Sequence, residues 1–169
     1  MKDIPVENVR NVVLLGHTGS GKTSLLDALL FRLGLNDRKG QPDNGTSAVD
    51  WTDEEKDRKI TVWAKPVELR RQSAGGIERF VMLDTPGYAD FVGQTTCAAA
   101  VADAALIVVD AVAGVQVGTI RAWRLCEQLK LPRGVLITGL DRDNANPAAV
   151  LTALQSAWGA RCVPLTLPG

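Results

Sequence analysis

The segment GHTGSGKT, residues 16–23, follows the apolar run VVLL and precedes the leucine-rich segment SLLDALLFRL. Gly16 and Gly21 permit backbone conformations in which successive N–H groups turn inward around an anion. A helix beginning at Lys22 adds the positive end of its dipole at the same place. The Lys22 side chain would reach the β- and γ-phosphates of a nucleotide, and the Thr23 hydroxyl would bind Mg²⁺. The segment therefore predicts a phosphate-binding loop between a strand and a helix.

A glycine-rich turn without a ligand is the alternative explanation of this segment. It would account for the glycines but not for the adjacent Lys22 and Thr23. A dinucleotide-binding loop is disfavoured, because no GxGxxG pattern passes through these glycines. His17 is the single histidine of the chain, and packing within the loop explains it better than catalysis does.

Short apolar runs alternate with helical patterns along the rest of the chain. Uninterrupted runs, as expected of parallel strands buried on both faces, occur at residues 12–15, 80–83, 106–109 and 135–137. Apolar residues at helical spacing occur over residues 25–33, 120–129 and 147–158. Gly34 ends the first helix and Pro132 closes the second, while the third opens with Asn146 as its N-cap and Pro147 as its first residue.

The segment ITVWAKPVEL, residues 60–69, differs from the other strands because it contains Pro66. It runs through the sequence QSAGGIE into the strand at 80–83, so we expect an edge strand in an antiparallel hairpin. Together the alternating elements predict an α/β domain of three layers, with a mostly parallel sheet and one antiparallel edge strand.

Composition limits the partners of this chain. It has 169 residues, of which 46% are hydrophobic, so it can bury one core. Nineteen basic residues balance nineteen acidic ones, so we expect no direct DNA or membrane binding. Cys97, Cys126 and Cys162 lack CxxC spacing, which favours reduced core cysteines over disulfides or zinc ligands. Without an apolar run suited to a signal peptide or a membrane span, we expect a cytoplasmic monomer.

A second phosphate motif, DTPG at residues 84–87, follows the apolar run RFVML. An acidic residue at that strand end can hold Mg²⁺ through water, although a lone aspartate there is often only a helix cap. Gly87 can bring its backbone N–H to a γ-phosphate and move when that phosphate leaves. Paired with the upstream GKT, Asp84 strongly indicates nucleotide binding.

Residues 35–59 are polar, rich in turn formers and without helical or strand periodicity. Such a long loop is either functional or a mobile surface insertion. Thr61 follows it and lies between the two phosphate motifs in chain order, where a GTPase places the threonine that completes the coordination of Mg²⁺. We therefore interpret residues 35–59 as a nucleotide-dependent switch.

The combined blocks resemble a known family. The segments GHTGSGKTSLLDALL, DWTDEEKDRKITV, DTPGYADFVG, DAVAGVQVGTIRAW and GLDRDNANP occur in the order and spacing of the N-terminal GTPase domain of elongation factor G. They look most like the paralogous elongation-factor-G-like group, in which tyrosine follows DTPG. The resemblance implies a P-loop NTPase fold of the GTPase type, GTP and GDP as ligands, Mg²⁺ as cofactor, and the ribosome as a partner of the full-length protein.

The resemblance also assigns roles to individual residues. Catalysis would involve Lys22, Gly87 and Tyr88, and Mg²⁺ would be attended by Thr23, Thr61 and Asp84. The nucleotide would contact Gly16, His17, Thr18, Gly19, Ser20, Gly21, Lys22, Thr23, Asp84, Thr85, Pro86, Gly87, Tyr88, Thr138, Gly139, Leu140 and Asp141.

Several positions depart from the family pattern. Members usually carry Asp where this chain has Gly19 and His where it has Tyr88, the residue that the ribosome positions beside the attacking water. Tyr88 can orient a water but is a poor proton acceptor, and packing at the start of the next helix is an equally good explanation. The base-reading block, usually Asn-Lys-x-Asp, has become Thr138 to Asp141, so weaker guanine binding is expected.

The sequence also suggests how this domain relates to a larger protein. The end, ARCVPLTLPG, resembles the point where elongation factor G enters an inserted subdomain, beyond which a loop closes the base pocket. We therefore expect residues 1–169 to form one P-loop GTP-binding domain, the N-terminal fragment of a multidomain protein. Two alternatives to a GTPase remain open: a GTP-binding switch module with little turnover, and a P-loop ATPase, which Asp141 and DTPG disfavour.

Overall fold

The computed structural model describes residues 4–73 and 76–166. Its sheet has the strand order β2-β3-β1-β4-β5. The strands are β1 (Val9–Gly16), β2 (Lys65–Ser73), β3 (Gly76–Asp84), β4 (Ala104–Asp110) and β5 (Arg133–Thr138). All neighbouring strands run parallel except β2, which pairs antiparallel with β3 at the edge. The predicted sheet, mostly parallel with one antiparallel edge strand, is confirmed.

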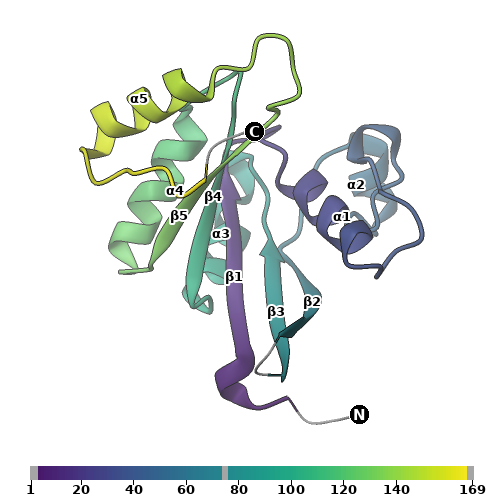
Figure 1. Cartoon of the computed structure of the whole chain (residues 1–169). Helices are drawn as coiled ribbons and strands as arrows, with labels where there is room; N and C mark the ends of the chain where they lie inside the picture. Colours follow the sequence, from purple (N-terminus) through teal and green to yellow (C-terminus); the bar gives the residue numbers. More distant parts are fainter. Residues whose placement is uncertain (1–3, 74–75, 167–169) are drawn as a thin grey trace.

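Helices cover both faces of this sheet, so the domain has the three layers that the sequence predicts (Figure 1). The helices within the described residues are α1 (Lys22–Arg32), α2 (Asp53–Arg58), α3 (Val92–Ala100), α4 (Val117–Gln128) and α5 (Pro147–Trp158). Because successive strand residues point to opposite faces, β1 supplies both layers. Its Leu14 packs with Leu26 of α1, and its Val13 and Leu15 pack with α3, α4 and α5.

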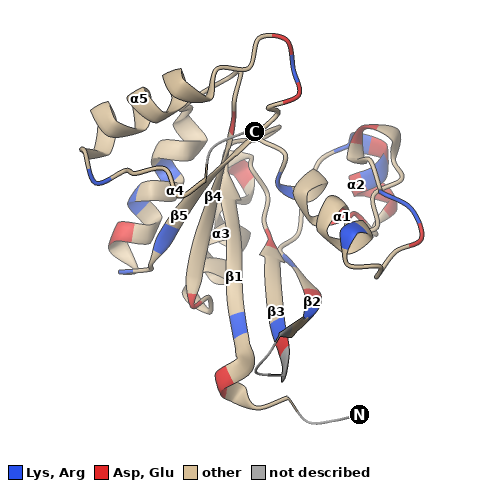
Figure 2. Ribbon diagram, viewed as in Figure 1, with Lys and Arg blue, Asp and Glu red and all other residues tan. Residues whose placement is uncertain are grey.

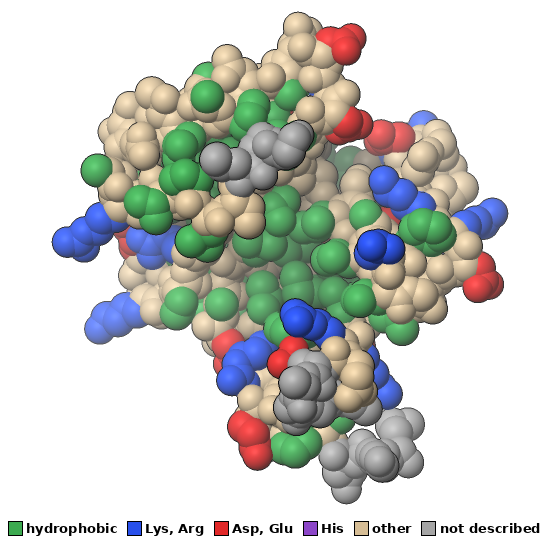
Figure 3. Space-filling view, viewed as in Figure 1, with side chains coloured by type: hydrophobic (Ala, Val, Ile, Leu, Met, Phe, Trp, Pro, Cys, Tyr) green, Lys and Arg blue, Asp and Glu red, His purple; other side chains and the backbone are tan. Residues whose placement is uncertain are grey.

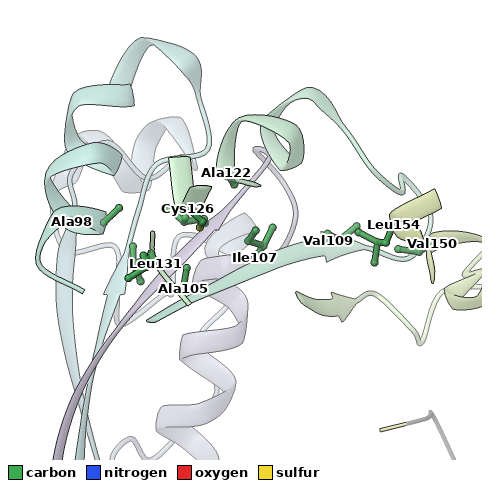
Figure 4. Close-up of a cluster of buried hydrophobic side chains, with 12 residues drawn as sticks. Ala98, Ala105, Ile107, Val109, Ala122, Cys126, Leu131, Val150 and Leu154 are labelled. Carbon is green, nitrogen blue, oxygen red and sulfur yellow. The ribbon is translucent and has the colours of Figure 1, made fainter. Parts of the chain in front are cut away.

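The larger of the two cores lies under α3, α4 and α5. Figure 4 shows Val150 and Leu154 of α5 beside Val109 of β4, and Ala122 and Cys126 of α4 toward Ile107 of β4 and Ala105. On the opposite face, the partly buried side chains that pack with α1 and the sheet include Leu25, Leu29, Leu30, Val12, Phe80, Leu106 and Leu136. Figure 3 shows hydrophobic side chains gathered across the middle of the molecule, with charged side chains mainly around its rim.

An aromatic stack joins α5 to α4. The rings of Trp123 and Trp158 lie 4.2 Å apart at an interplanar angle of 11°, and the Arg133 guanidinium lies 4.2 Å from the centre of the Trp123 ring. Glu127 accepts a hydrogen bond of 2.9 Å from Trp123 Nε1, which fixes the orientation of that ring. Stacking and cation–π contacts of this kind stabilise beyond the apolar area that they bury.

Several local predictions are confirmed. Gly34 has a φ of +68°, the left-handed conformation that ends α1. The Asn146 side chain caps α5 by accepting a hydrogen bond from Ala149 N at 2.9 Å, and Pro147 is the first residue of that helix. Residues 74–75, where the sequence predicts the hairpin turn, and residues 167–169 lie outside the described residues.

Other predictions were wrong. The edge strand begins at Lys65 instead of Ile60, so Thr61 lies before the strand and not within it. Cys97 is exposed, whereas a core position was expected; Cys126 is buried. Cys97 lies on the solvent side of α3, whose short helix buries Ala98 and Ala99 instead.

Residues 35–59 are also more regular than their sequence suggests. They contain α2, whose N-cap Thr52 accepts a hydrogen bond from Glu55 N. Val49 is buried against the α1 core, and the Asp27 carboxylate on α1 accepts a hydrogen bond of 2.9 Å from Ala48 N. Polar contacts and one apolar anchor therefore order a segment that lacks hydrophobic periodicity.

The Trp123–Trp158 stack provides a test of how α5 is held. We expect Trp158→Ala to lower the free energy of unfolding by about 2 kcal/mol, since it removes both the stack and a partly buried indole. Urea unfolding followed by circular dichroism measures this change. Trp51→Ala is the control, because Trp51 is 67% exposed. Equal losses in the two variants would show that the stack contributes nothing specific.

Candidate functional site

The phosphate-binding segment lies where β1 ends and α1 begins, at the carboxyl edge of the parallel strands. Gly21 caps α1 with a φ of +86°, a conformation that L side chains rarely adopt. A side chain at Gly16 would collide with the Val108 carbonyl of β4, and one at Gly87 would lie 2.5 Å from Thr18 N. Glycine at these positions therefore brings the strand, the loop and the DTPG segment within contact of one another.

Lys22 is almost fully buried within this loop. Its Nζ donates hydrogen bonds to the His17 carbonyl at 2.9 Å and the Gly16 carbonyl at 3.4 Å. Burial lowers the pKa of Lys22 to about 8, although the charge of Asp84 acts in the opposite direction. An ammonium in this environment favours an anionic ligand, which would replace the lost hydration.

Asp84 is fully buried at the end of β3. Burial raises its pKa to about 6, against the opposing effects of the Lys22 charge and a hydrogen bond from Thr23. Thr23 Oγ1 donates to Asp84 Oδ2 at 2.9 Å, whereas Asp84 Oδ1 is buried without a hydrogen-bond partner. An orphaned carboxylate oxygen at full burial indicates that a ligand belongs beside it.

The hydroxyls of Thr23 and Thr61 meet next to this carboxylate. Their Oγ1 atoms lie 3.0 Å apart, and Thr61 Oγ1 is also 3.4 Å from Asp50 Oδ1. Adjacent oxygen ligands of an octahedral Mg²⁺ with bonds of about 2.0–2.1 Å lie about 2.9 Å apart. Thr23, Thr61 and Asp84 therefore fit a magnesium ion, which when bound would neutralise phosphate charge.

The predicted base-reading block, residues 138–141, lies at the end of β5, beside the same loop. Thr138 Oγ1 donates a hydrogen bond of 2.7 Å to the Ser20 carbonyl, so the block is tied directly to the phosphate-binding segment. Gly139 adopts a φ of +67°. Leu140 is 43% exposed, and Asp141 is also exposed and therefore free to meet a ligand.

Comparison with known proteins agrees with this geometry. Residues 7–162 match the family described as the elongation factor Tu GTP binding domain. The chain belongs to this family. It is 41% identical over 160 residues to the elongation factor G-like proteins of two Mycobacterium tuberculosis strains, CDC 1551 / Oshkosh and ATCC 25618 / H37Rv. Those 160 residues are 95% of this chain and 22% of each relative, so the chain spans about a fifth of their length.

The fold comparison points the same way. A crystal structure of a Thermus thermophilus protein matches with a TM-score of 0.81 and 46% sequence identity, over 89% of this chain and 22% of the other. The chain is thus a GTP-binding domain related to that of elongation-factor-G-like proteins. Such domains bind guanine nucleotides, typically with Mg²⁺.

The remaining predicted residues of this GTPase domain have structural explanations. His17 Nδ1 accepts a hydrogen bond of 3.3 Å from Gly118 N at the start of α4, as expected of a packing role. Thr85 is fully buried, and its hydroxyl donates to the Leu14 carbonyl at 2.5 Å. The Pro86 carbonyl accepts a hydrogen bond of 3.2 Å from Thr95. These contacts anchor the two phosphate motifs to the sheet and the helices.

Tyr88 and Gly19 are the two departures from the family pattern at this site. The Tyr88 side chain is 42% exposed and borders a cavity of about 240 Å³ that Gly16, Gly87 and Leu125 also line. A Cβ at Gly19 would meet nothing within 4 Å, but the φ of +71° favours glycine. The phenol is thus next to the phosphate loop and is not locked by core packing.

Sequence reasoning missed the supporting side chains of this site. Asp50 and Glu55 are both buried and both bind Lys65, at 2.7 and 2.9 Å respectively. Asp110 accepts hydrogen bonds from Val112 N and pairs with Arg142 at 2.9 Å. Most of these residues lie within the segments that resemble the family, but nothing in their spacing indicates that they contact Lys65 or one another, so only the fold shows these contacts.

The raised pKa of Asp84 gives a test in the nucleotide-free chain. In the folded chain the Asp84 carboxyl has a pKa of about 6, whereas the ordinary value is 3.8. Ionisation of Asp84 therefore lowers the free energy of unfolding increasingly as pH rises through this interval, by about 3 kcal/mol in full. We expect Asp84→Asn to be more stable than the unaltered chain by about this amount above about pH 6.5, and by little near pH 4.

Urea unfolding at the two pH values measures this difference. Asp90→Asn is the control, since Asp90 is exposed in the same segment and should show no such pH dependence. A difference between Asp84→Asn and the unaltered chain that does not change with pH would contradict the proposed desolvation of this carboxylate.

Proposed function

We propose that this chain binds Mg²⁺ and GTP and hydrolyses GTP to GDP and phosphate. The observation that carries the proposal is the arrangement of the buried Lys22, Thr23 and Asp84 around the half-buried Thr61. It joins a desolvated ammonium, two adjacent hydroxyls and an orphaned carboxylate oxygen. A triphosphate with Mg²⁺ supplies the anion and the cation that these groups require.

Different residues of the site would bind different parts of the magnesium nucleotide. The loop from Gly16 to Thr23 would hold the phosphates, with Lys22 at the β- and γ-phosphates. Thr23, Thr61 and Asp84 would hold Mg²⁺. The Gly87 N–H would meet the γ-phosphate, which makes it the sensor of hydrolysis. Loss of that phosphate would release Thr61 and the switch at residues 35–59.

Asp141 would recognise the base. Its carboxylate can accept hydrogen bonds from guanine N1–H and the exocyclic amino group, which adenine cannot supply in that pattern. The Thr138 hydroxyl donates its hydrogen to the Ser20 carbonyl, and Gly139 has no side chain to pack on the guanine ring. Guanine affinity is therefore lower than an Asn-Lys-x-Asp block would give.

Tyr88 would act on the attacking water. Phosphoryl transfer depends mainly on positioning and charge stabilisation, so a phenol held in place can orient the water without accepting its proton. Here the phenol is 42% exposed, and a partner has to fix its rotamer. The isolated chain therefore turns over slowly, on the order of 10⁻³ s⁻¹ or below, as unassisted GTPases do.

Kinship with elongation factor G supports the ribosome as that partner, in the setting of a cytoplasmic translation factor. No helix in the described part of the chain is long and apolar enough to cross a membrane. The decisive experiment measures phosphate release from GTP with and without ribosomes. Release stimulated by ribosomes supports the proposal. Tight GTP binding without release in either condition would instead identify a switch module with little turnover.

Tyr88→Phe tests the role of the phenol. It removes only the hydroxyl, so we expect lower ribosome-stimulated turnover with an unchanged GTP dissociation constant. Phosphate release and equilibrium titration measure the two quantities separately. Turnover at the unaltered rate would assign Tyr88 a packing role and catalysis to another group.

Asp141→Asn tests base recognition. Exchanging a carboxylate for an amide reverses the preferred hydrogen-bond donors, and hydrogen bonds to charged groups contribute about 1.5–3 kcal/mol. We therefore expect GTP affinity to fall at least about tenfold, with selectivity moving toward xanthosine nucleotides. Asp143→Asn is the matched control, because Asp143 is exposed in the same loop. An unchanged GTP dissociation constant for Asp141→Asn would place this residue outside the base site.

A further inference from the structure

Lys65 is a buried cation that no phosphate motif includes. It is the first residue of β2 and lies directly opposite Asp84 in the antiparallel register with β3. Its Nζ pairs with Asp50 Oδ1 at 2.7 Å and with Glu55 Oε1 at 2.9 Å. All three side chains are at most 6% exposed. Figure 2 shows the charged residues of α2 and of the loop before it as blue and red stretches of the ribbon beside α1.

Glu55 ties this cluster to the chain segment that follows Thr61. The carboxylate oxygen that binds Lys65 also accepts hydrogen bonds from Val62 N at 3.0 Å and Trp63 N at 3.3 Å. The other oxygen accepts from Thr52 Oγ1 at 3.0 Å. One side chain of α2 therefore fixes the backbone next to Thr61, and Lys65 balances its charge.

Asp50 ties the same cluster to the Thr61 hydroxyl. The Asp50 oxygen that binds Lys65 is also 3.4 Å from Thr61 Oγ1. A hydroxyl has one hydrogen and two lone pairs. If the Thr61 hydrogen points to Asp50, a lone pair of Thr61 Oγ1 faces Thr23 Oγ1, which lies 3.0 Å away. The Thr23 hydroxyl donates its own hydrogen to Asp84. Two oxygens then present lone pairs to one another, which is the arrangement that a cation requires.

We propose that Lys65 is a positioning residue for GTP and Mg²⁺. It acts through Asp50 and Glu55 to set the position of Thr61 and the direction of its hydroxyl hydrogen. Breaking a buried ion pair by removing one partner leaves uncompensated charge, so loss of Lys65 would displace Asp50, Glu55 or both. Thr61 would then lose its acceptor and its backbone anchor together. This inference rests on the GTPase function proposed above.

The test is a double-mutant cycle between Lys65 and Thr61. Dissociation constants for GDP and a non-hydrolysable GTP analogue are measured with Mg²⁺ for the unaltered chain, Lys65→Met, Thr61→Ala and the double variant. Because Thr61 engages when the γ-phosphate and Mg²⁺ are present, each single variant should bind the GTP analogue about tenfold more weakly. GDP affinity should change by less than about twofold.

The double variant distinguishes positioning from a general structural effect. If Lys65 acts through Thr61, the double variant binds the GTP analogue no more weakly than Thr61→Ala does. Fully additive losses, or equal losses for GDP and the analogue, would overturn the proposal. Arg58→Met is the control, since Arg58 pairs with Glu54 at 3.2 Å on the exposed side of α2, the helix that carries Glu55. It should bind both nucleotides as the unaltered chain does.

Two further measurements keep the outcome decisive. Circular dichroism establishes that each variant is folded, and if Lys65→Met is not, Lys65→Arg replaces it in the cycle. Arginine keeps the positive charge, but its planar guanidinium cannot reproduce the contacts of the ammonium, so the same non-additivity is expected. An unaltered chain that binds no GTP analogue would count against the proposed function. An unaltered chain that binds it, with additive variants, would count against the role of Lys65 alone.

Discussion

The burial of opposite charges at the carboxyl edge of the sheet is the constraint on which the rest of the structure depends. Lys22 and Asp84 are both removed from water. Burial lowers the pKa of Lys22 and raises the pKa of Asp84, so it favours the neutral form of each. Lys22 donates to carbonyls of its own loop and Asp84 accepts from Thr23, so one carboxylate oxygen is left unsatisfied. The desolvation of both charges and the unpaired oxygen lower the stability of the free chain, and a bound anion and cation would offset that loss.

The fold supplies the geometry that makes this possible. Parallel strands β1 and β3 end side by side, which places the loop after β1 next to the DTPG segment, where Gly87 lies against Thr18. Glycines at the close contacts allow the backbones to approach, and Thr85 ties the second motif to β1 by its hydrogen bond to the Leu14 carbonyl. Helices on both faces pack against these strands.

The sequence was sufficient to predict elements whose cause is local. Buried parallel strands appear as apolar runs, Asn146 and Pro147 indicate the start of α5, and Gly34 indicates the end of α1. The relation between Thr23, Thr61 and Asp84 could also be predicted, because motif order fixes it and the structure brings their side chains into contact. Their roles toward a nucleotide stay predictions.

The buried polar cluster around Lys65 could not be predicted, for a physical reason. Helix α2 has six residues, all charged, and it is held by the Thr52 cap and by Glu55, whose buried carboxylate binds the segment from Val62 to Lys65 beyond the helix. Hydrophobic periodicity gives no indication of such a helix. Ion pairs such as Lys65 with Asp50 likewise depend on where β2 begins, and the sequence placed that start too early.

The most direct test of this account is the thermal unfolding midpoint of the chain with GTP, GDP or ATP, each with and without Mg²⁺. A ligand that binds only the folded state raises the midpoint, and the rise grows with the logarithm of the ligand concentration relative to its dissociation constant. If buried Lys22 and Asp84 bind a magnesium nucleotide, Mg²⁺ with GTP should raise the midpoint by several degrees. Removal of Mg²⁺ or replacement of GTP by ATP should reduce the rise. An unchanged midpoint with Mg²⁺ and GTP, or an equal rise with ATP, would contradict the account.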